Sequence, residues 1–210
     1  MWPQMPAKSV KETICAIATP PGSGALGVIR VSGPKALEIL SNLWRGPVPV
    51  EKFKPRTLYL GNISVFPNPQ SGPIDRVLAV FMPGPHSYTG DDVVELHCHG
   101  GAAAPKRLLD AVIRNGARPA GPGEFTRRAF INGRMDLTQA EAVAELIASK
   151  SASALALAER QVSGSLGRAV REVREPLLDV LADMESRLDF PEEDIPWRPK
   201  EELAAVVDGC

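Results

Sequence analysis

The sequence predicts an α+β fold, in which an N-terminal mixed-sheet domain over residues 1–120 precedes an all-helical bundle segment over residues 121–210. Before residue 120, short runs rich in β-branched residues alternate with proline- and glycine-rich turns, which is typical of strands. Two helical patterns interrupt these runs without strict strand–helix–strand alternation, which favours α+β over α/β. After residue 120, apolar residues recur at steps of three and four, the period of a helix.

The predicted elements of the N-terminal domain follow from these runs. We expect strands at 13–18, 26–32, 57–65, 75–82 and 92–98, and helices near 34–43 and 101–115. Pro34 suits the first turn of the first helix, where no amide hydrogen is needed. Asn115 and Gly116 suit the end of the second helix, because both tolerate a left-handed backbone.

The turn between the first two predicted strands holds G-S-G-A-L-G at 22–27, a formal G-x-G-x-x-G. In a dinucleotide-binding loop this pattern opens a helix, whose N-terminus holds the pyrophosphate. Here V-I-R-V follows at 28–31, and its β-branched residues favour a strand. We therefore expect a hairpin with a glycine-rich turn that places Arg30 on the departing strand, and dinucleotide binding is the weaker alternative.

The helical segment carries start signals and apolar stripes. Thr138 and Glu141 have the spacing of a capping box, and Asp136 with Gln139 offers an alternative frame. Residues 151–160 are rich in good helix formers. One helical face should consist of Leu137, Ala140, Ala144 and Ile147.

A long amphipathic helix, packed on other helices, is predicted after residue 165. Its apolar positions are Leu166, Val170, Val173, Leu177, Val180 or Leu181, Met184 and Leu188. Pro176 should kink this helix or divide it in two. The motif D-F-P-E-E-D-I-P at 189–196 should end it.

The composition is that of a soluble globular protein, with 44% hydrophobic and 23% charged residues. A net charge of −1 gives no overall attraction to nucleic acid. Basic residues dominate 100–135, and acidic residues dominate 172–210. This uneven charge indicates either two differently solvated surfaces or a functional patch. Three scattered cysteines, no signal peptide at 1–6 and no membrane-length apolar run indicate a cytoplasmic protein.

Three polar side chains alternate along the predicted strand that ends at residue 99. Glu95, His97 and His99 share one face and could bind a metal ion, or they could be a polar strand end before a glycine turn. Cys98 faces the other way and should be a small buried residue. A turn-rich loop at 83–92, stiffened by prolines, precedes this strand.

A short helix is predicted after Gly123, with Phe125, Ala129 and Phe130 on its apolar side and Arg127 and Arg128 pointing elsewhere. Asn132 and Gly133 should end it and leave Arg134 in a tight loop. An arginine there can donate two hydrogen bonds to a carboxylate or carbonyl group, or it can donate to the free carbonyl groups at the helix C-terminus.

Four motifs stand in order along the chain: A-T-P-P-G-x-G-x-x-G-V-I-R-V-S-G (18–33), F-M-P-G-P-x-S-Y-T-G-x-D-x-V-E-L-x-x-H-G-G (81–101), P-G-E-F-T-R-R-A-F-x-N-G-R-x-D-L-x-Q-A-E-A (122–142) and D-F-P-E-E-D-I (189–195). Together they resemble the tRNA-modification GTPases of the MnmE/TrmE family. The resemblance covers about residues 12–196 and is specific, because the motifs are long and ordered.

The resemblance implies a function for the N-terminal domain. Members of that family act with an FAD-containing partner (MnmG/GidA) to place an aminomethyl or carboxymethylaminomethyl group on the wobble uridine of certain tRNAs. The one-carbon donor is a tetrahydrofolate derivative, in the 5,10-methylene or 5-formyl form, held by an N-terminal domain that forms a homodimer. By motif position, the folate contacts fall on Arg30, Glu95 and Arg134, and no metal ligand or catalytic residue is assigned.

The sequence also departs from the family pattern. It ends at Cys210, where the family's G domain is expected to begin, so we expect a fragment or truncated form without the phosphate loop and the returning helices. GTP, Mg²⁺ and K⁺ would bind only with that G domain, and this chain alone should not hydrolyse GTP. The alternatives are a non-catalytic folate-binding and dimerisation module, or a stand-alone folate-dependent aminomethyltransferase. Cys210 matches no catalytic motif.

Overall fold

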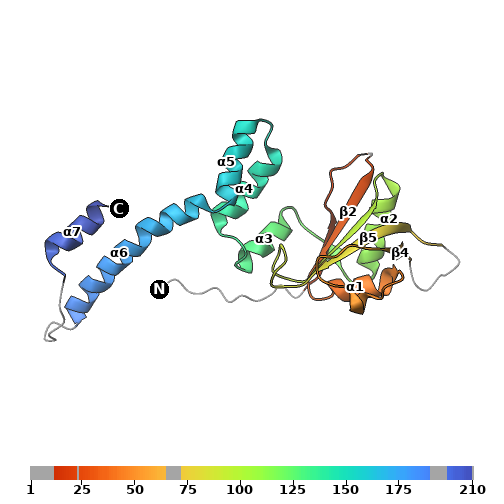
Figure 1. Cartoon of the computed structure of the whole chain (residues 1–210), viewed down its shortest axis with the longest axis horizontal. Helices are drawn as coiled ribbons and strands as arrows, with labels where there is room; N and C mark the ends of the chain where they lie inside the picture. The colour runs from red at the N-terminus through yellow and green to blue at the C-terminus, as the bar shows by residue number, and fades with distance from the viewer. Residues whose placement is uncertain (1–11, 23, 65–71, 190–197, 210) are drawn as a thin grey trace. The chain divides into compact units, whose positions relative to one another are not determined.

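The computed structural model describes residues 12–22, 24–64, 72–189 and 198–209. It divides into two compact units, Met1–Met135 and Asp136–Cys210. Figure 1 shows strands and helices in the first unit and helices alone in the second. The predicted α+β domain followed by a helical segment is confirmed.

A mixed sheet organises the first unit. Its strand order is β3-β4-β5-β6-β2-β1-β7, with antiparallel neighbours except for the parallel pair β1–β7. The strands are β1 (Ile14–Ile17), β2 (Leu26–Ser32), β3 (Trp44–Arg45), β4 (Tyr59–Ile63), β5 (Asp75–Met82), β6 (Val93–His99) and β7 (Arg118–Pro119). The five predicted strands are thus confirmed, whereas the two-residue strands β3 and β7 are too short to produce a recognisable period.

The glycine-rich turn joins β1 and β2 as an antiparallel hairpin, as predicted. Gly27 lies inside β2, and a Cβ atom added there would lie 2.7 Å from Pro105 Cγ. A side chain at this position would therefore push the sheet away from the helix that carries Pro105. Since the residues after the turn form a strand, the dinucleotide-binding alternative does not hold.

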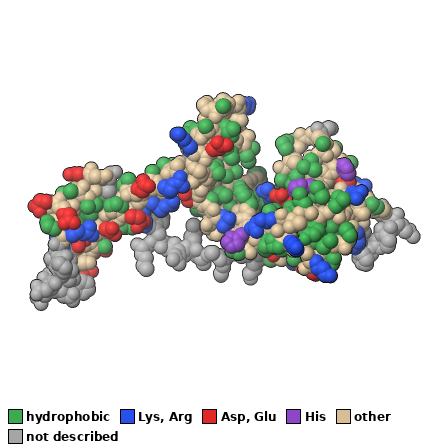
Figure 2. Space-filling view, viewed as in Figure 1, with side chains coloured by type: hydrophobic (Ala, Val, Ile, Leu, Met, Phe, Trp, Pro, Cys, Tyr) green, Lys and Arg blue, Asp and Glu red, His purple; other side chains and the backbone are tan. Residues whose placement is uncertain are grey.

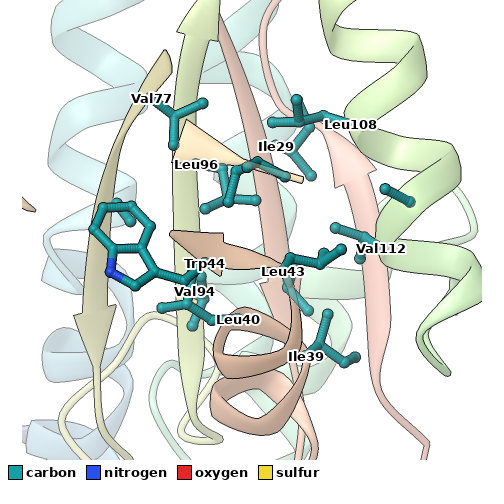
Figure 3. Close-up of a cluster of buried hydrophobic side chains, with 14 of the residues drawn as sticks. Ile29, Ile39, Leu40, Leu43, Trp44, Val77, Val94, Leu96, Leu108 and Val112 are labelled. Atoms are coloured by element: carbon teal, nitrogen blue, oxygen red, sulfur yellow. The ribbon is translucent and has the colours of Figure 1, made fainter. Parts of the chain in front are cut away.

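The core lies on one face of the sheet, beneath α1 (Ala36–Leu43) and α2 (Ala103–Arg114) (Figure 3). Side chains alternate along a strand, so Ile29 of β2 and Leu96 of β6 face this core, where both are fully buried. Complete burial of such a side chain stabilises the fold by about 1.5–3 kcal/mol. Arg30 and Glu95, one residue away along the same strands, consequently lie on the opposite face.

The first unit also includes the 3₁₀ turn η1 (Val50–Lys52) and α3 (Glu124–Ile131). The short helix α3 agrees with the prediction, and it ends at Asn132 before Gly133, whose φ of +69° favours glycine. The two units part between Met135 and Asp136, whereas the composition changes near residue 120. The difference is α3, which is tied to the sheet domain by the contacts described below.

The second unit begins with a capping box. Asp136 Oδ1 accepts the Gln139 amide at 2.8 Å, and Gln139 Oε1 accepts the Asp136 amide at 2.9 Å. The earlier of the two frames is therefore correct, and the Thr138–Glu141 frame is wrong. The helices are α4 (Leu137–Ala148), α5 (Ala152–Val162), α6 (Ser165–Asp189) and α7 (Lys200–Asp208).

The long helix α6 runs for 25 residues through Pro176, so the proline does not divide it. Its apolar stripe is largely exposed, and only Val180 among the stripe positions is buried. The expected packing on other helices is thus limited, because α5 and α7 are the main neighbours of α6 in the part described. The predicted α4 face is exposed as well, at Leu137 and Ile147. Residues 190–196 of the motif expected to end the helix lie outside the described residues.

Figure 2 shows acidic side chains gathered over α6 and α7, in agreement with the uneven charge of the sequence. None of the helices described combines the length and the apolar character that a bilayer crossing requires.

Candidate functional site

Arg30 and Glu95 form an ion pair on the sheet face opposite the core. They stand directly across from each other on β2 and β6, and Arg30 Nε and Nη2 both lie 2.8 Å from Glu95 Oε1. Their side chains are 29% and 17% exposed, so the pair is partly shielded from water. The strand register therefore brings together two of the three residues assigned by the resemblance.

Two aromatic rings flank the Arg30 guanidinium. Its Cζ lies 5.3 Å from the centroid of the Tyr88 ring and 5.7 Å from that of Phe125. Both distances are within the range of a cation–π attraction. Tyr88 Oη also lies 2.8 Å from Thr126 Oγ1 of α3, which fixes the orientation of its ring. The cationic member of the ion pair thus lies close to two aromatic rings.

The loop at 83–92 that carries Tyr88 is held from two sides. Ser32 Oγ of β2 lies 2.7 Å from Thr89 Oγ1, and both side chains are buried. Asn132 Nδ2, at the end of α3, donates to the Thr89 carbonyl at 2.7 Å. These bonds explain how an irregular loop can present an aromatic ring at a defined place.

Arg134 reaches the same loop rather than the ion pair. Its Nε donates to the Ser87 carbonyl at 3.1 Å, next to Tyr88, and the residue as a whole is exposed. The contacts found for Arg134 do not extend to Glu95. The structure therefore joins Arg30 to Glu95 directly and places Arg134 beside the loop that covers Arg30.

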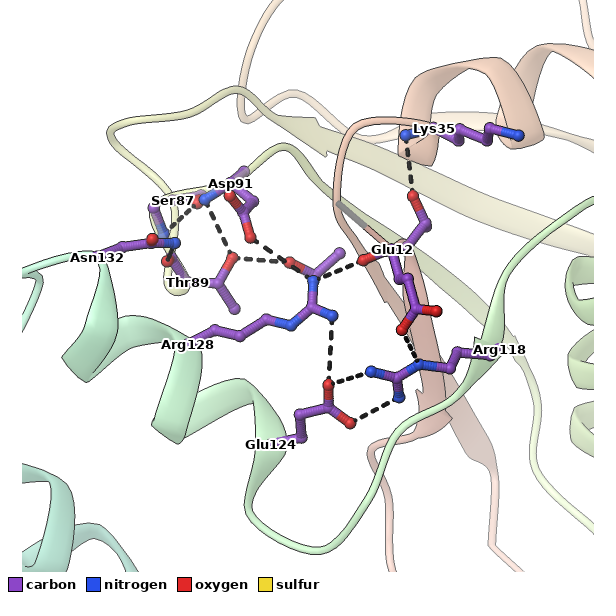
Figure 4. A network of polar contacts seen from close by, with 12 residues as sticks. Glu12, Lys35, Ser87, Thr89, Asp91, Arg118, Glu124, Arg128 and Asn132 are labelled. Atoms are coloured by element: carbon purple, nitrogen blue, oxygen red, sulfur yellow. Dashed lines mark hydrogen bonds and ion pairs between the residues drawn. The ribbon is translucent and has the colours of Figure 1, made fainter. Parts of the chain in front are cut away.

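An ionic network around the buried side chains of Arg128 and Glu124 ties α3 to the sheet domain (Figure 4). Arg128 is 1% exposed and donates to the Glu12 carbonyl at 2.8 Å and to Glu124 Oε1 at 3.2 Å. Asp91 Oδ2, in the loop at 83–92, lies 3.7 Å from Arg128 Nη1. The expectation that Arg128 points away from the packed side of α3 is therefore wrong. The spacing of Glu124 and Arg128, four residues apart, was the sequence signal for their pairing.

Glu124 is the anionic centre of this network. Its two oxygens accept from Arg118 Nη1 and Nη2 at 2.9 and 2.7 Å, the bidentate geometry preferred by arginine. These hydrogen bonds are the main reason why the pKa of Glu124 falls from 4.5 to about 2. Burial raises the pKa of Asp91, against the opposing effect of the Arg128 charge.

The two histidines that end β6 have different environments. His99 is held by Asp75, whose Oδ1 lies 2.7 Å from His99 Nδ1. Burial raises the pKa of Asp75, but hydrogen bonds from His99 and from the amide of Arg76 lower it overall. His97 Nε2 is buried without a hydrogen-bond partner, 3.5 Å from Glu95 Oε2. Leaving such a group unsatisfied costs about 1–3 kcal/mol.

This arrangement does not favour the metal alternative for Glu95, His97 and His99. Their polar atoms do not converge, because His99 is directed to Asp75. Within the part of the chain that the structure describes, no group of three His, Cys, Asp or Glu residues is suited to a metal ion. Cys98 is buried as predicted.

The glycine-rich turn lines a separate cavity of about 550 Å³. The start of α2 forms its other side, at Pro105 and Lys106. Arg30 is not among its lining residues, so the turn and the ion pair belong to different surface features.

Both units match models of known protein families. Residues 13–134 match the family model described as GTP-binding protein TrmE N-terminus, and residues 137–209 match the MnmE helical domain. The chain belongs to the MnmE/TrmE family. The tRNA modification GTPase MnmE of Heliobacterium modesticaldum is 48% identical over 89% of this chain and 40% of its own length. That of Symbiobacterium thermophilum is 46% identical over 95% of this chain and 44% of its own length.

The chain therefore spans about two fifths of the length of these MnmE relatives. The boundary between the two MnmE family models, at 134–137, agrees with the boundary between the two compact units. Arg30, Glu95, Tyr88, Phe125 and Arg134 all fall within the first model. The site is thus contained in the TrmE N-terminal domain.

Proposed function

We propose that this chain is the part of a tRNA wobble-uridine modification enzyme that binds the tetrahydrofolate one-carbon donor. The observation that carries the proposal is the Arg30–Glu95 pair, whose guanidinium lies near the rings of Tyr88 and Phe125. A reduced pterin contains a planar pyrimidinone ring with adjacent N–H donors and a carbonyl acceptor, and the tail of a folate ends in carboxylates. A carboxylate, two arginines and aromatic surfaces match that combination.

In this proposal, Glu95 accepts from the N–H donors of the pterin ring, while Arg30 and Arg134 bind the carbonyl or the tail carboxylates. The preformed Arg30–Glu95 bond fixes the position of the Glu95 carboxylate in the ligand-free protein. The folate supplies the one-carbon unit in its 5,10-methylene or 5-formyl form. The protein residues bind and orient it.

The remaining functions belong to the whole enzyme. We propose that the parent protein is a cytoplasmic GTPase that modifies tRNA together with an FAD-containing MnmG/GidA-type partner. GTP, Mg²⁺ and K⁺ would bind the G domain of that parent protein. The exposed stripe of α6, at residues such as Val170 and Leu181, would pack on helices from the rest of the parent protein.

We further propose that the first unit forms a homodimer. The edge strands β3 and β7 are short, so they offer little backbone for strand pairing between two copies of the chain. Leu60 and Leu78, on β4 and β5, are 46% and 36% exposed and offer apolar contact area near one of these edges.

Calorimetric titration with 5-formyltetrahydrofolate tests the folate proposal. Glu95→Gln keeps the shape but replaces an acceptor oxygen by an NH₂ donor, and Arg30→Ala removes the partner of a shielded charge. Each should weaken binding by at least about tenfold, which is about 1.4 kcal/mol. Glu175→Gln is the matched control, because Glu175 is 61% exposed on α6 and should leave binding unchanged. Unchanged affinity in both folded site variants would refute the site.

A further inference from the structure

Among the described residues, His97 is a polar residue of this face whose Nε2 makes no hydrogen bond. It follows Glu95 by two residues on β6, so the two side chains share one face of the sheet. Its cross-strand neighbours are Val28 on β2 and Leu78 on β5, neither of which offers a polar side chain. Nε2 is nevertheless buried and lacks a hydrogen bond.

The charged groups around His97 do not satisfy it. Glu95 Oε2 is 3.5 Å away, too far for a good hydrogen bond, while Glu95 Oε1 is engaged by Arg30. Arg76 lies on β5 two residues before Leu78, the cross-strand neighbour of His97, and so belongs to the same face of the sheet. Buried polar atoms in folded proteins normally have a hydrogen-bond partner. A ligand bound at the proposed site could supply the partner that Nε2 of His97 lacks.

We propose that His97 is a ligand-contacting residue that completes the site with Glu95. Neutral imidazole Nε2 accepts one N–H of an exocyclic amino group, and Glu95 accepts the other N–H or that of the adjacent ring nitrogen. The ligand class is a planar heterocycle with an amino group next to a ring N–H, as in a pterin. This inference rests on the proposed folate function. It adds His97 as a ligand contact and makes binding depend on the protonation of His97.

Protonation of His97 should weaken ligand binding. When His97 takes up a proton, Nε2 becomes a donor and can no longer accept from the ligand. The imidazolium then attracts Glu95 and competes with the ligand for it. Binding therefore requires the neutral form of His97, and affinity falls as the pH is lowered.

The test is calorimetric titration of the whole chain with 5-formyltetrahydrofolate between pH 5.5 and 8. The wild-type protein should bind more weakly at pH 5.5 than at pH 8. His97→Gln keeps an acceptor that does not titrate, so its affinity at pH 8 should stay within about threefold and should change little with pH. His99→Gln is the matched control on the same strand, since His99 is 75% exposed and paired with Asp75, and it should keep the wild-type profile.

A second variant separates binding from a structural role. His97→Phe removes a buried unsatisfied nitrogen between apolar neighbours, so the ligand-free protein should unfold at the same or higher urea concentration, while affinity at pH 8 falls at least about tenfold. A lower unfolding midpoint with unchanged affinity would show that His97 is structural. A His97→Gln profile identical to that of the wild type would also overturn the inference and leave the folate proposal standing. Absence of wild-type binding at pH 8 would overturn both.

Discussion

Neutralising Glu124 should remove part of the stability that the first unit has at neutral pH. The perturbation is Glu124→Gln, which keeps the size of the side chain but takes the negative charge from between Arg118 and Arg128. The pKa of Glu124 is lower in the folded protein than in the unfolded chain. Its stabilisation is therefore complete above about pH 4.5, and it is lost as the pH falls through about 2.

The magnitude follows from that pKa change. A fall from 4.5 to about 2 corresponds to about 3 kcal/mol of stability at neutral pH. Arg118 is 39% exposed, so solvent screens part of this interaction, and we expect about 2 kcal/mol. At pH 2.5 roughly a quarter of the effect should remain, because Glu124 is then partly protonated in the folded state as well.

Urea unfolding at pH 7, 4 and 2.5 measures this difference. Trp44 is buried in the core of the first unit, so its emission reports that unit once Trp2 and Trp197 are replaced by phenylalanine. Glu175→Gln is the control, because Glu175 and Arg174 form an exposed pair and should contribute less than about 0.5 kcal/mol. If the wild-type protein and Glu124→Gln lose stability in parallel between pH 7 and 2.5, the network does not act as argued.

Two further outcomes are expected for the whole chain. Highly purified protein should release no phosphate from GTP above a buffer blank, because its sequence contains no G-x-x-x-x-G-K-[ST] loop to stabilise the γ-phosphate charge, and measurable turnover would contradict this. Sedimentation should show a dimer at roughly tens of micromolar, and a monomer throughout that range would count against self-association of this chain.

The sequence allowed the strands to be predicted because alternation is a local property. In β6, burial alternates from Val94 to His99 as expected for a strand. The pairing of Arg30 with Glu95 spans 65 residues, and no local pattern specifies that register. The motif resemblance, rather than the periodicity, brought these two residues into one site.

The network around Glu124 could not be predicted for a related reason. Arg118, Glu124 and Arg128 are close in sequence, but Glu12 and Asp91 join them from distant segments. Whether an arginine on a short helix is buried depends on whether those segments supply enough acceptors, since an unpaired buried charge is very costly. Helical periodicity reports only which side of α3 is apolar.

The helix α3 connects the ionic network to the candidate site. Phe125 and Thr126 contact Arg30 and Tyr88, while Arg128, one turn later, pairs with Asp91 at the far end of the loop that carries Tyr88. The loop is thus held at two points of one short helix, and that helix is anchored by Glu124 to Arg118. Because every one of these contacts lies within residues 12–134, the geometry around Arg30 and Glu95 is set by the first unit itself. Folate affinity measured on this chain therefore tests the proposed site.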